Sequence, residues 1–235
     1  MEGMPKKVLA IIPARIDSSR FPAKMIAEET GNPLIQYAWE NANAATIVTD
    51  VFIATDSEKI ASICTAFGAK VIMTGEHPNG TSRIAEAVRE MNCDIVVNMQ
   101  GDEPELDPAV IDATVAALGD ASMGTACCAL QQEEFDNEHV VKVMVDSNKA
   151  LDFFRQHETG AMRHIGLYVY KPEFLQTYVE MQPTQNEISR RLEQMRAIDN
   201  GYSIAVAHVA PQPGGIDTKE QYNEFVRRVG SDAHS

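Results

Sequence analysis

The chain has 235 residues, 44% of them hydrophobic, which is typical of one large domain or of one domain with a small appendage. A formal net charge of −14 argues against binding to nucleic acid or to a membrane surface, because no basic stretch could follow a phosphate polymer. The four cysteines lie in apolar contexts without metal-ligand spacing, as buried thiols do in a reducing compartment. We see no N-terminal signal and no apolar run of roughly 20 residues, so we expect a cytoplasmic protein.

The first half of the chain alternates between apolar runs and amphipathic segments. The runs predict strands and the segments predict helices: strands at 7–12, 50–54, 70–73 and 94–99, and helices at 33–46, 58–67 and 81–91. Such regular alternation implies an α/β fold with a mostly parallel sheet and right-handed crossovers.

The second half of the chain loosens this alternation. Its patterns predict helices at 108–118, 172–181, 187–200 and 218–229, and strands at 123–130, 164–170 and 203–209. Two short strands at 140–145 and 150–154 predict a hairpin around Asp146-Ser147-Asn148. Either Asp217 or Thr218 caps the final helix. Because no repeat or low-complexity tract divides the chain, we expect a single domain at 1–235.

A basic loop follows the first predicted strand. Arg15, Arg20 and Lys24 are spaced by five and four residues, and Ser18 and Ser19 lie between them. Arginine forks, lysine charges and serine hydroxyls are the groups that bind phosphate oxygens, although three cations alone fit a solvated loop equally well. The position of the loop favours a ligand, because ligands of open α/β sheets bind at the carboxyl ends of the strands.

The segment Gly75-Glu76-His77-Pro78-Asn79-Gly80-Thr81-Ser82 has the glycine spacing of a phosphate-binding P-loop. A P-loop needs a lysine where this chain has Thr81, and Pro78 removes a backbone donor, so the kinase or ATPase interpretation is poor. We interpret the glycines as part of a capped turn before a helix. No G-x-G-x-x-G fingerprint follows a predicted strand, which also argues against a dinucleotide site.

Two aspartates are candidates for binding a divalent cation. Asp102 follows a buried strand in Gln100-Gly101-Asp102-Glu103-Pro104, and Mg²⁺ usually takes one or two protein carboxylates together with substrate phosphates. Asp217 could be the second acid, since Gly214 and Gly215 before it let the backbone approach closely. The competing interpretation of Asp217 is a simple helix cap.

Several motifs, in order along nearly the whole chain, together resemble the 3-deoxy-manno-octulosonate cytidylyltransferases, also called CMP-Kdo synthetases. The motifs are Ile12-Pro13-Ala14-Arg15, Ser19-Arg20-Phe21-Pro22-Ala23-Lys24, Ala54-Thr55-Asp56, Asn79-Gly80-Thr81-Ser82-Arg83, Val97-Asn98-Met99-Gln100-Gly101-Asp102-Glu103-Pro104, Arg163-His164-Ile165-Gly166-Leu167-Tyr168, Leu192-Glu193-Gln194-Met195-Arg196 and Gly215-Ile216-Asp217-Thr218.

This resemblance implies a nucleotidyltransferase-type fold with a smaller antiparallel subregion for sugar binding and dimerisation. It implies transfer of CMP from CTP to a 2-keto-3-deoxy sugar acid, release of pyrophosphate, Mg²⁺ as the cofactor and a homodimer. Within the single domain it implies a CTP-binding half at about 1–130, the sugar-binding and dimerisation subregion at 131–215 and a C-terminal helix at 216–235.

The resemblance also implies roles for individual residues. It assigns the nucleotide to Ala14, Arg15, Ser19, Arg20, Lys24, Arg83 and Gln100. The triphosphate falls on Arg15, Ser19, Arg20 and Lys24, and cytosine and ribose lie near the first strand, Arg83 and Gln100. It assigns the sugar acid to Gln100, His164, Tyr168, Glu193 and Gln194. It assigns Mg²⁺ to Asp102 and Asp217, and catalysis to these two acids together with Arg15, Arg20 and Lys24. His164 is the candidate side-chain base, with hydrogen bonding to the sugar as the alternative.

The chain departs from the family pattern at three places. The segment between Phe154 and Arg163 is shorter than the family's, which has a Ser-Arg and a Pro-Ile-Pro pattern that helps to close the sugar site. Ala23 and Met25 replace the usual glycine and proline beside Lys24. Arg190-Arg191 stands where an acidic residue is common, and this changed charge suits either a differently substituted sugar or an exposed helix surface. The identity of the sugar therefore stays open.

Two other functions compete with this interpretation. A sibling cytidylyltransferase for another sugar acid would keep the triphosphate motifs and differ in the sugar region. A non-catalytic module would bind the nucleotide or nucleotide sugar without releasing pyrophosphate. Retention of both candidate metal acids argues against the second, since binding alone seldom requires two.

Overall fold

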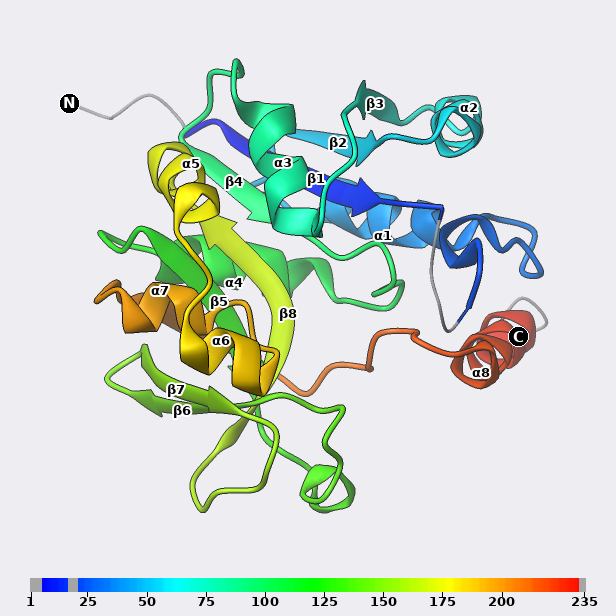
Figure 1. Ribbon diagram of the computed structural model, residues 1–235. Helices are drawn as coiled ribbons and strands as arrows, with labels where there is room; N and C mark the ends of the chain where they lie inside the picture. Colours follow the sequence, from blue (N-terminus) through cyan, green and yellow to red (C-terminus); the bar gives the residue numbers. More distant parts are fainter. Residues whose placement is uncertain (1–5, 17–20, 233–235) are drawn as a thin grey trace.

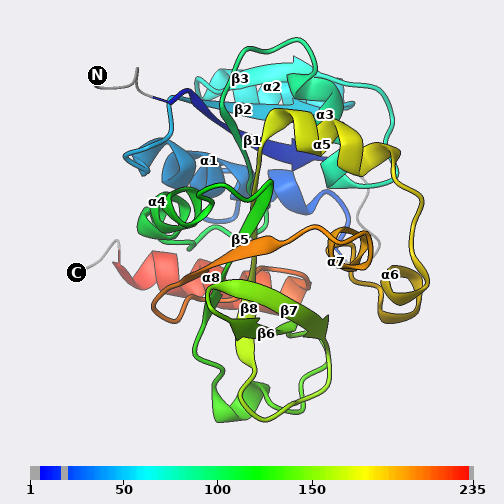
Figure 2. The ribbon, with the colours of Figure 1, turned by 90° about the vertical axis from the view of Figure 1, so that its left-hand side faces the viewer.

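The computed structural model describes residues 6–16 and 21–232, with side chains up to residue 230. One sheet of nine strands forms its centre, in the order β3-β2-β1-β4-β8-β5-β9-β7-β6 (Figures 1 and 2). The strands are β1 (Val8–Ala14), β2 (Asp50–Thr55), β3 (Lys70–Met73), β4 (Ile95–Asn98), β5 (Met123–Cys128), β6 (Lys142–Asp146), β7 (Lys149–Phe154), β8 (Met162–Tyr170) and β9 (Ile204–His208).

The α/β fold is confirmed, and the sheet is mixed: it is parallel where the first half of the chain forms it and combines antiparallel and parallel pairs in the rest. Strands β3, β2, β1 and β4 are parallel, as the alternation of strands and helices predicts. Strand β8 then runs antiparallel to both β4 and β5, while β9 is parallel to β5. Whether β8 pairs parallel or antiparallel with β4 and β5 depends on tertiary packing, and no local pattern in the sequence predicts the direction of the strand.

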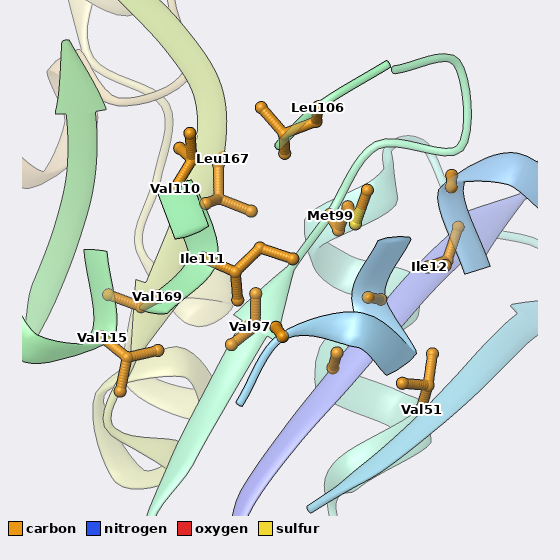
Figure 3. Packing of buried hydrophobic residues seen from close by; sticks show 14 of the residues in the cluster. Ile12, Val51, Val97, Met99, Leu106, Val110, Ile111, Val115, Leu167 and Val169 are labelled. Carbon is orange, nitrogen blue, oxygen red and sulfur yellow. The ribbon is translucent and has the colours of Figure 1, made fainter. Parts of the chain in front are cut away.

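Helices cover both faces of the sheet because its strands bury side chains on both sides. Val8, Ala10 and Ile12 of β1 pack on one face, with α1 (Leu34–Ala44), α2 (Glu58–Ala66) and α4 (Pro108–Ala117). Leu9 and Ile11 pack on the other, with α3 (Gly80–Val88), α5 (Pro172–Glu180) and α7 (Met195–Asp199). Figure 3 shows the first cluster, where Ile111 of α4 reaches toward Val97 of β4.

The predicted hairpin is confirmed. Strands β6 and β7 pair antiparallel, and the turn residues Ser147 and Asn148 both have positive φ angles, 49° and 61°. Two successive residues of this kind are typical of a type I′ turn, whose twist matches that of the strands it joins. The hairpin extends the sheet, since β6 also pairs with β8 and β7 with β9.

The predicted helix at 187–200 is wrong, because the segment forms two short helices. A capping box of Thr184 and Glu187 begins α6 (Gln185–Arg190), and Arg191, with φ 55° and ψ 48°, ends it in the left-handed region. Residues Leu192–Gln194 then lead into α7. The break is set by tertiary contacts to the connecting backbone, including the Tyr178 hydroxyl, which donates to the Glu193 carbonyl at 2.6 Å.

Helix α8 (Lys219–Asp232) packs against the segment between β1 and α1 (Figure 1). Tyr222 and Phe225 pack with Phe21, Leu34 and Ile216 in a third buried cluster. The last helix thus covers the segment that follows the first loop. Among the described residues, none of the helices has the length and apolar character needed to cross a lipid bilayer.

Candidate active site

A pocket of about 340 Å³ lies where β1 and β4 end. Strand β1 contributes Ala14 and the following Arg15, and β4 is followed by Gln100 and Asp102. These are the carboxyl ends of parallel strands, where ligands of α/β sheets bind. The pocket is completed by Lys24, Arg83 and Asp217. Ser19 and Arg20, two further predicted phosphate ligands, lie outside the described residues.

Lys24 joins the two candidate acids. Its ammonium group donates to Asp102 Oδ2 at 2.6 Å and to the Ile216 carbonyl at 2.6 Å, and lies 3.7 Å from Asp217 Oδ1. Since only 5% of the residue is exposed, the competing interpretation of a solvated loop is wrong for Lys24. A buried ammonium needs such partners, because leaving water without them is costly.

Asp217 reaches the pocket through a close backbone contact, as its two preceding glycines predict. The Ile216 amide donates to the Asp102 carbonyl at 2.8 Å, and a side chain on Gly215 would meet the same carbonyl at 3.4 Å. Thr218 caps α8. Its hydroxyl accepts from the backbone amide of Gln221, and the side-chain carbonyl of Gln221 accepts from the backbone amide of Thr218. The capping role therefore does not require the Asp217 carboxylate.

Arg83 lines the pocket but is also held by its neighbours. Its guanidinium donates to Asp56 Oδ2 at 2.8 Å and to the Thr74 hydroxyl at 2.6 Å. Asp56 and Thr74 follow β2 and β3, so this arginine ties the ends of two strands to the first turn of α3. With 3% exposure it presents a fixed charge to the pocket.

Residues 77–80, at the beginning of α3, form a wall of the pocket that was not predicted. Asn79 caps the helix by accepting from the Ser82 amide at 2.8 Å, which confirms the capped turn. Gly80 is needed there, because a Cβ atom would lie 3.0 Å from the Pro13 ring. His77 also lines the pocket and contacts the Glu86 carboxylate. Pro78 and Asn79 belong to the segment 75–82, whose P-loop-like glycine spacing was the one feature of the sequence that could have pointed to this wall.

Buried polar side chains lead away from Gln100. Its amide donates to Asn98 Oδ1 at 3.0 Å. The hydroxyl of Tyr170 lies beside Asn98 and Thr81, and Thr81 in turn lies beside Glu193. Burial raises the pKa of Glu193, against the opposing effects of Thr81 and Arg196. One residue assigned to the nucleotide is therefore connected to one assigned to the sugar.

His164 is deeply buried in β8, between the rings of Phe153 and Tyr168. Its Nε2 lies 2.9 Å from the Thr125 hydroxyl, which donates to the Leu167 carbonyl at 2.8 Å. The Thr125 hydroxyl has a single proton, which it donates to the Leu167 carbonyl. In the bond between Thr125 and His164 the hydroxyl oxygen must therefore accept, so the Nε2 atom of the imidazole carries a proton and donates it. Burial lowers the pKa of His164 to about 3.

The remaining sugar-assigned residues lie on the same side of the sheet as His164. Tyr168 is close enough to Glu193 for the charge of that acid to raise the tyrosine pKa further, on top of the larger effect of burial. Gln194 is buried where α7 begins. His164, Tyr168 and Gln194 do not line the pocket that holds Lys24, whereas Gln100 does.

Glu103 follows the pocket residue Asp102 in the chain, and the sequence assigned it no role of its own. A Cβ on Gly166 would lie 3.0 Å from its Oε1, and one on Gly215 would lie 3.4 Å from its Cγ, so two glycines make room for this side chain. Burial, and then the charge of Asp102, raises the pKa of Glu103 to about 7, while Arg163 opposes the shift. Gly166 belongs to a bulge of β8 opposite β5, which no sequence pattern foretold.

A pocket at the carboxyl ends of parallel strands, with cations for phosphates and two acids joined by one lysine, is that of a nucleotidyltransferase. The cytidylyltransferase family model matches residues 9–204. The 3-deoxy-manno-octulosonate cytidylyltransferase of Solibacter usitatus is 39% identical and is aligned over 95% of both chains. The mitochondrial enzyme of that name from Arabidopsis thaliana is 38% identical over 93% of this chain and 82% of its own. The chain therefore belongs to the 3-deoxy-manno-octulosonate cytidylyltransferase family.

Solved structures agree with this assignment. A CMP:2-keto-3-deoxy-manno-octonic acid synthetase in complex with CTP has a TM-score of 0.91 and 31% identity, over 96% of this chain and 99% of that one. The inositol-1-phosphate CTP transferase of T. maritima, with a TM-score of 0.72, 14% identity and 95% and 94% of the two chains covered, shares the fold alone.

Proposed function

We propose that this protein transfers CMP from CTP to 3-deoxy-manno-octulosonate or a closely related sugar acid, with release of pyrophosphate. The observation that carries the proposal is the contact of Lys24 with Asp102 and Asp217 in a pocket at the carboxyl ends of β1 and β4. Membership of the family supports the reaction. The homodimer implied by the family resemblance, with the β6–β7 hairpin in its sugar-binding and dimerisation subregion, is part of the proposal.

The residues present fit a divalent cation. Two carboxylates approach one point from β4 and from the segment before α8, and Mg²⁺ usually takes one or two carboxylates with substrate phosphates. We assign the metal to Asp102 and Asp217. When bound, it would withdraw electron density from the phosphate oxygens and lower the pKa of a coordinated hydroxyl.

The side chains of the protein position the reactants and balance their charge. Arg15, Lys24 and Arg83 line the pocket and supply positive charge for the triphosphate, on which negative charge builds as the acceptor hydroxyl attacks the α-phosphorus and pyrophosphate leaves. Such transfers depend on position and electrostatics, so no covalent nucleophile is required. A pKa of about 3 makes His164 a weak base at neutral pH, and we assign it a hydrogen-bonding role.

One observation favours a sibling acceptor over 3-deoxy-manno-octulosonate itself. Strand β7 ends at Phe154 and β8 begins at Met162, which leaves only a short connection where the family resemblance implies a longer segment near the sugar. A shorter wall would admit an acceptor with a different substituent. The nucleotide chemistry is unaffected by this choice.

The test is a pyrophosphate-release assay with CTP and a panel of acidic sugars, with Mg²⁺ and with excess chelator. We expect turnover with CTP and a 2-keto-3-deoxy sugar acid, and loss of turnover on chelation. Nucleotide binding without pyrophosphate release from any acid in the panel would leave the binding module as the function. Full turnover in chelator would remove the metal assignment.

The Asp217→Asn variant tests the acid in particular. We expect CTP affinity to change little and kcat to fall by at least about tenfold, because an interaction made chiefly in the transition state affects kcat. Asparagine caps a helix about as well as aspartate, so a capping role alone predicts nearly normal rates. Near-normal kcat at saturating substrates would exclude Asp217 from the reaction.

A further inference from the structure

The connection between β9 and α8 carries Asp217 to the pocket and has no secondary structure of its own. Within the described part of the chain, residues 209–217 belong to neither a helix nor a strand, and most of residues 210–215 are exposed. Pro211 and Pro213 lack the amide that pairing with a strand would use, and Gly214 and Gly215 have wide conformational freedom. The position of Asp217 must therefore be set by contacts from other elements.

Arg163 supplies two of these contacts. Its guanidinium donates to the Gln212 carbonyl at 2.7 Å and to the Pro213 carbonyl at 3.3 Å. A side chain on the next residue, Gly214, would place a Cβ atom 3.5 Å from the same guanidinium. A guanidinium suits this task, because its five N–H donors lie in one plane and can bind several oxygens at once. Arg163 thus lies along three successive residues of the connection.

Arg163 is itself firmly held in the sheet. It lies where β8 pairs with Cys128 of β5 on one side and with Lys142 of β6 on the other. Its guanidinium is 3.1 Å from Glu134 Oε1, and the side chains of this pair are only 16% and 18% exposed. Glu134 also accepts from the Gln131 amide at 3.0 Å. The contacts of Arg163 with the connection therefore start from a fixed point.

The inner end of the connection is tied to the pocket by the residue directly before Asp217. The Ile216 amide donates to the Asp102 carbonyl at 2.8 Å, and the Ile216 carbonyl accepts from the Lys24 ammonium at 2.6 Å. Arg163 holds the outer end, a few residues earlier in the chain. Without that outer contact, the exposed residues between the two ends would be free to carry Asp217 away from Asp102.

We propose that Arg163 is a positioning residue for the transfer: by holding the β9–α8 connection, it sets the position of Asp217 relative to Asp102. This inference rests on the proposed function. Arg163 does not line the pocket, and its partners in the connection are backbone carbonyls, so its effect on the reaction passes through the connection. A displacement of about 1 Å at a site of this kind can cost about a hundredfold in rate.

The test compares three variants with the wild type. Arg163→Met removes the charge and the donors but keeps an unbranched side chain, and Arg163→Lys keeps the charge without the planar fork. Arg190→Met is the matched control. Arg190 also binds one carboxylate and one backbone carbonyl, those of Asp152 at 2.5 Å and Phe153 at 3.0 Å, but it holds β7 rather than the connection.

Pyrophosphate release is measured with CTP, Mg²⁺ and the sugar acid that the wild type turns over fastest. For Arg163→Met we expect kcat to fall at least about tenfold and the KM of each substrate to stay within about threefold, because a misplaced Asp217 affects mainly the chemical step. The kcat of Arg163→Lys should lie between those of Arg163→Met and the wild type. Arg190→Met should keep kcat within about twofold of the wild type.

A double-variant cycle shows whether Arg163 acts through Asp217. In Asp217→Asn the carboxylate is already absent, so adding Arg163→Met should change kcat by less than about threefold. Hydrogen exchange of the Ile216 amide is a readout that does not depend on turnover. It should accelerate at least about tenfold in Arg163→Met but not in Arg190→Met, while the amides of β5 and β8 stay protected.

An equal fall in kcat from Arg163→Met in the wild-type and Asp217→Asn backgrounds would overturn the inference, and so would unchanged exchange of the Ile216 amide. Thermal unfolding shows whether each variant folds. If Arg163→Met is unfolded, Arg163→Lys takes its place, and unchanged kcat and exchange in that variant would overturn the inference. Absence of wild-type turnover with every acid in the panel would instead overturn the proposed function, while the exchange measurement would still test the hold of Arg163 on the connection.

Discussion

A single buried lysine links two acids that lie far apart in the sequence. Lys24 carries one positive charge against the negative charges of Asp102 and Asp217, so the three groups together have a net charge of −1. A triphosphate brought to this point adds further negative charge, and Coulomb repulsion grows as water is excluded. A divalent cation arriving with the nucleotide would reverse that balance, which is the electrostatic reason to expect one here.

Ala23, directly before this lysine, is strained. It has φ 55° and ψ 25°, in the left-handed region that glycine tolerates, and it stands where the family commonly has glycine. Ala23→Gly should raise the unfolding free energy by about 0.5–1 kcal/mol, because relief of the strain exceeds the added freedom of the unfolded chain. Chemical denaturation measures this change.

The matched control for that prediction is Ala27→Gly, four residues along the same loop. Ala27 has an ordinary φ of −67°, so glycine there should lower the unfolding free energy by a similar amount. Equal destabilisation by both substitutions would show that Ala23 is not strained.

His164 should make stability depend on pH. Its pKa is lowered to about 3 in the folded protein, from an ordinary value of 6.5, so the unfolded chain binds the proton more tightly. The stabilising contribution is then complete above pH 6.5 and is lost as pH falls. Between pH 8 and pH 5 it should amount to about 2 kcal/mol.

Comparison with His164→Asn isolates this contribution, because other titrating groups act equally in both proteins. Denaturation at several pH values should show the wild type losing more unfolding free energy on acidification than the variant. Parallel pH profiles would mean that His164 keeps an ordinary pKa in the folded protein.

Much of the pocket could be predicted from the sequence, whereas the place of Glu103 could not. Arg15, Lys24, Gln100 and Asp102 follow strands whose carboxyl ends must meet, so their convergence follows from topology. The place of Glu103, by contrast, depends on the absence of a side chain at Gly166, which lies where the pairing of β8 with β5 shifts register. Tertiary pairing of this kind leaves no local signal.

At the scale of elements, α6 and α7 act as one unit around Arg196. This arginine is 7% exposed, donates to Glu187 of α6, and lies 5.1 Å above the ring of Tyr178 of α5. It fixes the connection that carries Glu193. The apolar spacing at 187–200 fits one helix equally well, so the break could not be predicted from periodicity; contacts with other elements override local preference.

Arg196→Met should lower the unfolding free energy by about 3 kcal/mol. The Glu187 side chain is only 12% exposed, and the substitution leaves this nearly buried carboxylate without its partner. The double variant Arg196→Met with Glu187→Met should lose less than the single variant, since neither charge is then left alone. Denaturation of the wild type, of Arg196→Met, of Glu187→Met and of the double variant provides the measurement. A double variant that loses as much as the sum of the two single variants would show that the pair is not coupled.

At the scale of the whole molecule, two segments far apart in the sequence, one after β1 and one before α8, meet at the site. The first loop brings Lys24, and the segment before α8 brings Asp217, so the geometry between them depends on how α8 is seated. The helix is held by the third cluster, in which the ring of Tyr222 packs at a tilt against that of Phe21, with the ring centroids 5.3 Å apart. The Tyr222 hydroxyl accepts from the Glu29 backbone amide at 3.0 Å. This cluster is separate from the two that cover the sheet.

Tyr222→Ala should therefore uncouple activity from the stability of the sheet. Removal of a fully buried aromatic ring typically costs about 3–5 kcal/mol, which here acts on the docking of α8 while the large clusters on the sheet remain. We expect kcat to fall at least about tenfold as Asp217 loses its fixed distance from Lys24. Hydrogen exchange should accelerate in 219–230 and stay slow in β1 and β4.

Tyr222→Phe is the matched control: it keeps the ring, loses one hydrogen bond and should retain most activity. Equal acceleration of exchange in β1 and α8 would show that the helix and the sheet unfold together, against the separate seat argued here.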